Sequence, residues 1–297
     1  MISAVVVINP LSGRGRYDDQ VEADAAIARS VLAAHGIAAT VHPTTASGDA
    51  HRFAREAIAR SIDLVIAWGG DGTINEVASA LMHTEAVLAI VPAGSGNGLA
   101  GDLGIPFDAR AALTIAATGR TVTIDAGRLD DVPFFNIAGI GIDAVIANRF
   151  AERGLRRRGP LGYLSLSLSE LLRYRAKTYR LTLDGDVFDR PVMLLALANG
   201  RQYGNRVLIA PGARLDDGLL EVVVVEPMSL PVIASKLPSL FRGTLRTSPG
   251  ITMRAAREIH VEAAGEIPFH VDGEPRIGTD RLTIRAIPAA LRVKAPG

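Results

Sequence analysis

The segment AWGGDGTINEVASAL, residues 67–81, sets three glycines and an aspartate between an apolar run and a pattern of helical spacing. Residues 64–67 predict a buried strand that enters the segment, and residues 74–81 predict a helix that leaves it. Glycine permits positive φ and lets backbone N–H groups approach an anion, and a helix N-terminus adds partial positive charge. The segment therefore favours a phosphate-binding turn; the plain alternative is a tight turn with Asp71 as a solvated cap.

Two further glycine-rich loops also follow apolar runs. Residues 92–98 (PAGSGNG) come after the run 87–91, and residues 9–15 (NPLSGRG) come after the run 4–8. Ser95, Asn97 and Arg14 are of types that bind phosphate or ribose. A capped turn would explain Ser95 and Asn97 equally well, and Arg14 taken alone fits a solvated loop charge better than a phosphate ligand. None of these loops is a Walker A motif, because the only lysines are at positions 177, 236 and 294.

The first part of the chain predicts a doubly wound α/β domain with a mostly parallel sheet. Helical spacing over residues 19–35 and 50–60 alternates with strand-like runs at 4–8, 38–42, 64–67 and 87–91. Such alternation is typical of a sheet covered by helices on both faces, which binds ligands at the carboxyl ends of its strands. The three glycine-rich loops fall at these ends.

The pattern changes after about residue 123. Short strand-like runs, several of them separated by Asp-Gly turns, predict a mostly antiparallel second domain, an all-β sandwich. The runs are residues 134–138, 180–183, 192–198, 219–225, 259–262, 269–271 and 281–287, and helical insertions are expected at 161–174 and 230–241.

Composition narrows the functional classes. Of the 297 residues, 48% are hydrophobic, which is enough for a substantial core, and the formal net charge of +1 argues against a nucleic-acid binder. The absence of cysteine excludes disulfides and thiolate metal sites. The first ten residues, MISAVVVINP, lack the basic region of a signal peptide, and no uncharged apolar run is long enough to span a bilayer. We expect a cytoplasmic protein, with contact at the inner membrane face left open.

The motifs of both halves, taken in order, carry a resemblance. The first half contributes Asn9-Pro10 with Ser12-Gly13, Gly69-Gly70-Asp71-Gly72-Thr73 and Gly94-Ser95-Gly96-Asn97, and the second half contributes residues 135–143 (FNIAGIGID), 199–204 (NGRQYG), 210–219 (APGARLDDGL) and 271–275 (VDGEP). The set resembles the diacylglycerol/sphingosine lipid kinase family, in its bacterial soluble branch. The Gly-Gly-Asp-Gly-Thr motif is shared with NAD kinases and related phosphofructokinases, whereas the ordered set is far more specific.

The resemblance implies an ATP- and Mg²⁺-dependent kinase that phosphorylates a diacylglycerol- or sphingosine-like lipid hydroxyl in an interdomain cleft. It implies a nucleotide-binding domain of residues 1–123 with about 287–297, and a lipid-substrate sandwich of residues 124–286. The implied partner is a lipid at a membrane surface, with no nucleic acid and no transmembrane segment, and a homodimer is left open.

The resemblance also implies residue roles. Glu274 accepts the proton of the attacking hydroxyl, and Asp272 beside it supports it or a metal. Asp71 either binds the Mg²⁺ that bridges the phosphates, which we prefer, or contacts the substrate hydroxyl. The implied nucleotide-binding residues are Asn9, Ser12, Gly13, Arg14, Thr44, Gly69, Gly70, Gly72, Thr73, Asn75, Gly94, Ser95, Gly96 and Asn97, with Thr45 as the alternative to Thr44.

A second, structural Mg²⁺ site is implied at the Asp217 carboxylate with the carbonyls of Arg214 and Leu219, where an Asx turn is the plain alternative. Gly98 departs from the pattern, because many diacylglycerol kinases of this branch carry aspartate there. The departure removes one acid from the expected Mg²⁺ network and leaves the identity of the lipid substrate undecided. Asp125 and Asp143 are candidates for the remaining acids.

Two further alternatives stay open. The segment 149–163 carries five arginines beside an apolar stretch, which fits either an anionic bilayer or a solvated loop. An NAD kinase, or a catalytically silent lipid- or nucleotide-binding protein with the same fold, is the alternative to the lipid kinase.

Overall fold

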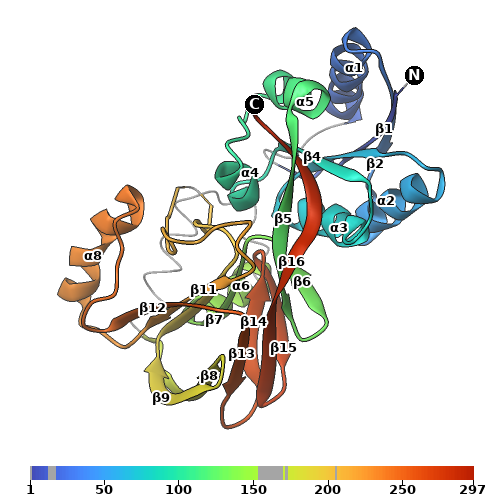
Figure 1. Cartoon of the computed structure of the whole chain (residues 1–297). Coiled ribbons are helices and arrows are strands. Elements are labelled where there is room, and N and C mark those ends of the chain that lie inside the picture. Colours follow the sequence, from blue (N-terminus) through green and yellow to red (C-terminus); the bar gives the residue numbers. More distant parts are fainter. Residues whose placement is uncertain (1, 13–17, 153–169, 171–172, 205) are drawn as a thin grey trace. The chain divides into compact units, whose positions relative to one another are not determined.

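The computed structural model describes residues 2–12, 18–152, 170, 173–204 and 206–297 (Figure 1). The chain forms two units, Met1–Asp125 with Pro288–Gly297, and Ala126–Ile287. It passes from the first unit to the second within β5 (Arg120–Leu129) and returns within β16 (Arg281–Ala295). The last residues of the chain therefore belong to the first unit.

The first unit is built on a parallel sheet. Its strand order is β2 (Ile37–Pro43), β1 (Ile2–Ile8), β3 (Leu64–Gly69), β4 (Val87–Pro92) and the end of β16. Every residue of β3 and β4 is buried, as expected for strands covered on both faces.

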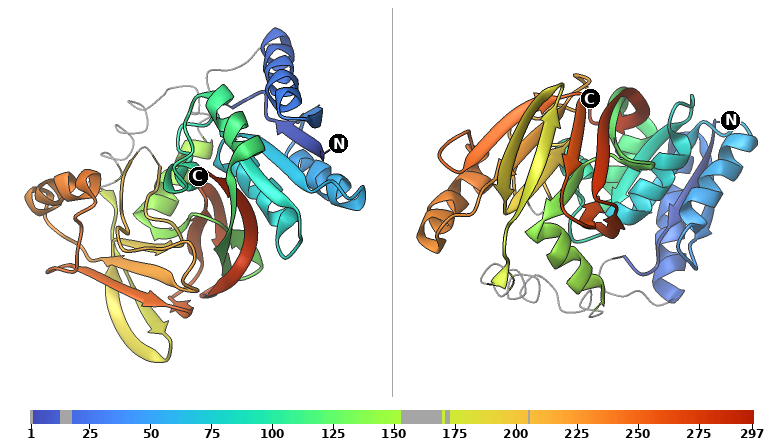
Figure 2. Two further views of the ribbon diagram at one scale, coloured as in Figure 1. Left: turned by 45° about the horizontal axis from the view of Figure 1, so that its top comes forward. Right: turned by 90° about the horizontal axis from the view of Figure 1, so that it is seen from below.

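Helices cover this sheet on both faces. On one face α1 (Asp18–Ala34) packs beside α5 (Ala109–Thr118), and on the other α2 (Asp49–Ala59) packs beside α3 (Asp71–Leu81), as Figures 1 and 2 show. The predicted doubly wound α/β domain is confirmed. The strand order reverses between β1 and β3, so the loops that leave these two strands are neighbours at the point where such sheets bind ligands.

The second unit has two antiparallel sheets. One has the order β12 (Ile251–Ala256), β11 (Leu220–Val225), β10 (Leu194–Ala198), β7 (Ile137–Gly141), β14 (Ile267–Val271) and β15 (Glu274–Gly278). The other runs from the first part of β16 through β13 (Glu258–Glu262) and β8 (Lys177–Leu183) to β9 (Asp186–Val192), and β5 pairs with β16 and with β6 (Val132–Phe134).

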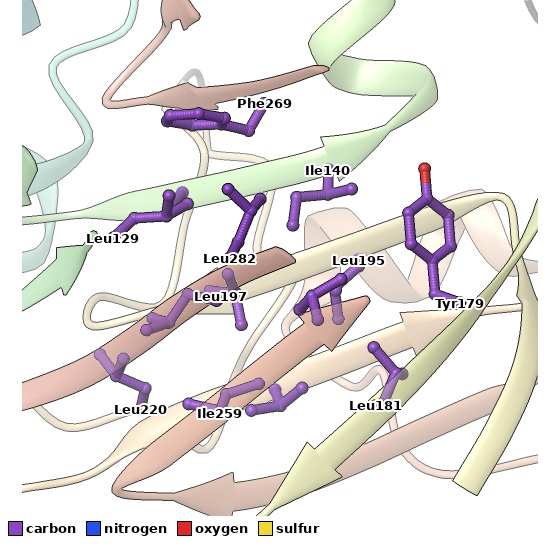
Figure 3. Close-up of a cluster of buried hydrophobic side chains, with 14 of the residues drawn as sticks. Leu129, Ile140, Tyr179, Leu181, Leu195, Leu197, Leu220, Ile259, Phe269 and Leu282 are labelled. Carbon is purple, nitrogen blue, oxygen red and sulfur yellow. The ribbon is translucent and has the colours of Figure 1, made fainter. Parts of the chain in front are cut away.

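The core of the second unit lies between these sheets. Leu181, Ile259 and Leu282 come from one sheet, Ile140 and Leu197 come from the other, and all are fully buried in one cluster (Figure 3). Alternate residues along each strand enter this cluster, which is the pattern of a sandwich. The predicted all-β second domain is confirmed.

The remaining helices are α4 (Gly98–Asp102), α6 (Ile142–Glu152) and α8 (Leu230–Arg242) among the described residues. The insertion predicted at 230–241 is α8, whereas most of the one predicted at 161–174 lies outside the described residues. Strands β9, β12 and β15 were not expected. All three are edge strands with several exposed residues, so their sequences lack a clear apolar alternation.

Within the described part of the chain, no helix has the length and apolar character needed to cross a bilayer.

Candidate active-site residues in the two units

Asp71 joins the two glycine-rich loops that follow β3 and β4. It is the first residue of α3, and its two carboxylate oxygens accept hydrogen bonds from the backbone N–H groups of Asn97 (2.8 Å) and Gly98 (3.0 Å). Hydrogen bonds to a charged acceptor are among the stronger ones in proteins. The carboxylate therefore fixes the loop 94–98 against the start of α3.

The glycines serve close packing rather than unusual backbone angles. A Cβ on Gly94 would lie 2.6 Å from the Gly70 Cα, and a Cβ on Gly69 would lie 2.6 Å from the Thr73 Cβ. None of the glycines in these two loops has positive φ, and the residue that adopts it is Asn97, at 52°. Glycine is needed here because two backbones and a helix start come within contact distance.

Polar contacts tie the loop after β1 to the start of α3. The Asn9 amide Nδ2 donates to the Thr73 hydroxyl (2.9 Å), and the Gly70 N–H donates to the Ser12 hydroxyl (3.2 Å). The structure thus brings Asn9, Ser12, Gly70 and Thr73 together at the carboxyl ends of β1 and β3. The neighbouring Gly13 and Arg14 lie outside the described residues.

The loop after β2 is held by two carboxylates. Glu76 of α3 accepts hydrogen bonds from the N–H groups of Gly48 (2.9 Å) and Ala50 (3.1 Å) and so caps α2. Asp49 accepts from the N–H and the hydroxyl of Thr45, both at 2.8 Å. These bonds, with the Arg52 guanidinium first among the causes, hold the pKa of Asp49 well below its ordinary value.

These contacts separate the two candidate threonines. The Thr45 hydroxyl is engaged by Asp49. The Thr44 N–H donates to the Ile8 carbonyl, which places this residue next to the end of β1. The geometry favours Thr44, of the two, as the residue available to a ligand at this edge of the sheet.

The other sequence-predicted residues of this edge divide into exposed and engaged groups. Ser95 is exposed. The Asn97 side chain is buried and bonded within its own loop, to the N–H and the carbonyl of Gly94. Asn75 accepts a hydrogen bond from the Ser79 hydroxyl at 3.2 Å, and Asp125 is buried and accepts from the Ala289 N–H. Asn97 and Asp125 are therefore parts of the scaffold.

In the second unit, Asp272 and Gly273 form the turn between β14 and β15, both with positive φ. The Asp272 carboxylate accepts hydrogen bonds from the N–H groups of Phe135 (2.9 Å), Asn136 (3.0 Å) and Ile137 (3.0 Å). The strand expected at 134–138 breaks at these residues, between β6 and β7. Asp272 thus anchors the turn that presents the half-buried Glu274.

A partly buried polar cluster lies next to this turn, and sequence reasoning missed its histidine. The Asp143 Oδ2 accepts from the Tyr203 hydroxyl (2.7 Å) and lies 3.2 Å from the His270 Nε2, while the Gly273 N–H approaches the His270 Nδ1 at 3.4 Å. The tautomer with a proton on Nε2 satisfies both contacts of the ring. This cluster connects Asp143 to the turn before Glu274.

One signal for this cluster was present in the sequence. A Cβ on Gly139 would overlap the Asp143 carboxylate and the His270 ring. Glycine inside a strand marks a place where something approaches the backbone closely, and β7 carries Gly139 and Gly141. The approaching side chains are four and 131 residues further along the chain, so the sequence does not say which they are.

The predicted structural metal residues form a turn before β11. Asp217 accepts a hydrogen bond from the Leu219 N–H at 3.0 Å, which is the Asx turn named as the alternative, and Arg214 pairs with Asp216. Burial, and then the negative charge of Asp217, raise the pKa of Glu221. Among the described residues no group of three or more histidine, aspartate or glutamate side chains is close enough to hold a metal, so a cation here would depend on carbonyl oxygens.

Comparison with known proteins agrees with this arrangement. Residues 3–129 match the pattern of the diacylglycerol kinase catalytic domain, and residues 136–295 match that of the YegS C-terminal NAD kinase beta sandwich-like domain. The chain is 35% identical over 296 residues to "Probable lipid kinase YegS-like" of Klebsiella pneumoniae (strain 342), covering 96% of this chain and 94% of the relative. It is 33% identical over 304 residues to "Diacylglycerol kinase" of Mycobacterium tuberculosis (strain ATCC 25618 / H37Rv), covering 97% and 93%.

The fold has solved counterparts. The crystal structure of a diacylglycerol kinase from Bacillus anthracis str. Sterne superposes with a TM-score of 0.75 at 21% identity, over 99% of this chain and 96% of the other. With both domain patterns and full-length relatives matched, the chain belongs to the diacylglycerol kinase and YegS-like family of lipid kinases, which are phosphotransferases that use a nucleotide.

Proposed function

We propose that the protein transfers the γ-phosphoryl group of ATP, with Mg²⁺, to the hydroxyl of a diacylglycerol- or sphingosine-like lipid. Family membership supports the reaction class, and the name of the Mycobacterium tuberculosis relative supports diacylglycerol as the acceptor. Gly98, which stands in place of an aspartate, is the reason to keep a sphingosine-like acceptor in the test.

The observation that carries the proposal is the pair of hydrogen bonds from the Asn97 and Gly98 N–H groups to the Asp71 carboxylate, which we call the Asp71 clamp. Its carboxylate holds the loop 94–98 against the start of α3, so two glycine-rich loops and a helix N-terminus lie together at one edge of the sheet. Such N–H groups and the helix dipole bind phosphate. Asn9, Ser12, Thr44 and Ser95 stand at the same edge and supply side-chain donors for the nucleotide.

The residues at this edge also fit a magnesium ion. Mg²⁺ prefers a carboxylate together with phosphate oxygens and water, and Asp71 is the acidic residue in the first turn of α3. A carboxylate oxygen carries two lone pairs and can accept an N–H group and contact a cation at the same time. Asp71 would hold the ion, which when bound neutralises charge on the phosphates.

The second unit supplies the base in this proposal. Glu274 accepts the proton of the lipid hydroxyl as that oxygen attacks the γ-phosphorus. Asp272 positions Glu274 through its three bonds to the backbone of residues 135–137. The Asp143–His270 pair positions the same turn through Gly273.

The test is transfer of labelled phosphate from ATP with Mg²⁺ to a panel of diacylglycerol, monoacylglycerol, sphingosine, ceramide, phosphatidylglycerol and NAD. We expect a labelled lipid with the wild-type protein, and its loss with Glu274→Gln. The matched control is Glu266→Gln, because Glu266 is exposed in the loop before β14, and this variant should keep wild-type activity.

The panel also separates the alternatives. Label on NAD alone would identify an NAD kinase. Bound ATP with no transfer to any acceptor would support a catalytically silent binding protein, and a Glu274→Gln variant as active as Glu266→Gln would remove Glu274 from the mechanism.

A further inference from the structure

Helix α8 (Leu230–Arg242) exposes an unusual amount of apolar surface. Four of its large hydrophobic side chains are exposed: Leu230 (45%), Val232 (39%), Leu237 (46%) and Phe241 (60%). Across the whole described part of the chain nine such side chains are exposed, so almost half of them lie on this one helix. A concentration of this kind marks an interaction surface rather than scattered surface residues.

Three of these side chains form a stripe. Leu230, Leu237 and Phe241 are spaced i, i+7 and i+11, which places them on one face of a helix. A different side of α8 holds it to the second unit, because Leu240 packs against the cluster on the outer face of β10 and β11, and the Lys236 Nζ donates to the Ser248 hydroxyl at 2.8 Å. The stripe therefore stays uncovered while the helix is anchored.

Figures 1 and 2 both show α8 at the edge of the second unit. None of its residues is buried.

The charge around α8 is one-sided. Residues 227–257 contain no aspartate or glutamate and carry five basic residues, Lys236, Arg242, Arg246, Arg254 and Arg257. The whole chain has a net charge of only +1, so the remainder of the chain is net negative by four. The four arginines of this segment are exposed, although Arg254 pairs with Asp186.

We propose that α8 and the segment that follows it bind the surface of an anionic lipid bilayer, with the Leu230–Leu237–Phe241 stripe among the upper acyl chains and the basic residues at the headgroups. An exposed apolar stripe within a segment whose charged residues are all basic is the composition of an interfacial helix, and the absence of acidic residues over 31 positions suits a negative surface. A second copy of this chain would have to bring together two surfaces of the same positive charge.

This inference extends the proposed function, since a membrane-resident acceptor requires the enzyme to reach a bilayer, but it is testable without it. The experiment measures sedimentation of the full chain with vesicles of phosphatidylcholine mixed with phosphatidylglycerol, and with vesicles of phosphatidylcholine alone. The assay contains no nucleotide and no acceptor lipid, so a failed kinase assay leaves its result unaffected.

We expect binding to the anionic vesicles that weakens as salt is raised. Leu237→Ser and Phe241→Ser should each lower the association constant for anionic vesicles by about tenfold, because each removes one apolar side chain that would be buried in the bilayer. Val187→Ser is the matched control, since Val187 is 60% exposed on β9 of the same unit. All three sites are exposed, so thermal unfolding should show that the variants remain folded.

Three outcomes would overturn the proposal. One is equal binding of wild type and both α8 variants to anionic vesicles. Another is equal binding to the two kinds of vesicle. The third is a dimer in lipid-free solution that Leu237→Ser and Phe241→Ser convert to a monomer, which would assign the stripe to a second copy of the chain.

Discussion

At the scale of single residues, carboxylates do most of the positioning in both units. Asp71, Glu76 and Asp272 each accept hydrogen bonds from two or more backbone N–H groups of a segment far away in sequence. One carboxylate in such a place is enough to fix a loop. Replacing the carboxylate leaves the backbone N–H donors without their acceptor. Substitutions to the neutral amide test each clamp with little change of shape.

For Asp71→Asn we expect a loss of about 1–3 kcal/mol in the free energy of unfolding, because an amide oxygen replaces only one of the two charged acceptors. Nucleotide affinity should fall in parallel as the loop 94–98 loosens. Urea denaturation and ATP titration calorimetry measure the two effects. Asp63→Asn is the control, since Asp63 is exposed before β3; equal stability of the two variants would contradict the clamp.

For His270→Asn we expect kcat of the proposed reaction to fall about tenfold or more with the KM for ATP unchanged. The ring contacts the turn before the proposed base Glu274, whereas the proposed nucleotide-binding residues belong to the first unit. Asp143→Asn should have a similar effect, and the double variant should lose little more than either single one. His260→Asn serves as the control. Additive losses, or a rise in KM alone, would argue against this positioning role.

At the scale of elements, the proposed functional residues lie in turns at strand ends, whereas the strands form the core. In the turn 217–219 before β11, a candidate cation-binding carboxylate lies close to a second carboxyl group in the strand. Burial and the charge of Asp217 raise the pKa of Glu221, so its ionised form is disfavoured in the folded protein. The contribution of the neutral Glu221 carboxyl to the free energy of unfolding is fully present below the pKa of an ordinary glutamate. It is lost as pH rises through the raised pKa of the folded state.

Glu221→Gln should therefore stabilise the metal-free protein at neutral pH, by less than about 1 kcal/mol because solvent screens a partly exposed carboxyl, and the gain should vanish in acid. Added Mg²⁺ should raise the melting temperature of the wild type more than that of Asp217→Asn if the turn binds a cation. Thermal melts over pH and Mg²⁺ measure both. Identical Mg²⁺ responses would dismiss the metal site at this turn.

At the scale of the whole molecule, the chain order and the spatial units do not coincide. Residues 288–297 follow the sandwich in sequence but belong to the first unit, where Arg292 and Val293 pair with β4. Leu291 and Val293 are buried there. The stability of the first unit thus depends on the last residues of the chain.

Deleting residues 288–297 should destabilise the first unit by several kcal/mol, because it removes buried side chains of roughly 1.5–3 kcal/mol each and leaves the edge of β4 unpaired. Limited proteolysis followed by mass spectrometry should show cleavage within residues 2–125 in the deleted protein. Removal of Gly297 alone is the control. Resistance of the first unit after the longer deletion would contradict this dependence.

The sequence by itself determined the class of both units, because their signals are local. Apolar runs, helical spacing and Asp-Gly turns reflect burial and backbone preference within a few residues, and the helix 230–241 followed from the same spacing. The edge strands β9, β12 and β15 were not predicted, because strands with one uncovered edge and exposed residues lack the apolar pattern. The glycine loops were predicted, whereas the close contact of Gly70 with Gly94 is seen only in the structure.

Only the tertiary structure decided which side chains meet. The approach of Gly70 to Gly94, the capping of α2 by Glu76 and the Asp143–His270 pair join residues 24 to 127 positions apart. Which donors meet which acceptors depends on the order of strands in the sheets. A local pattern carries no record of that order, so these contacts appear only when the chain is folded.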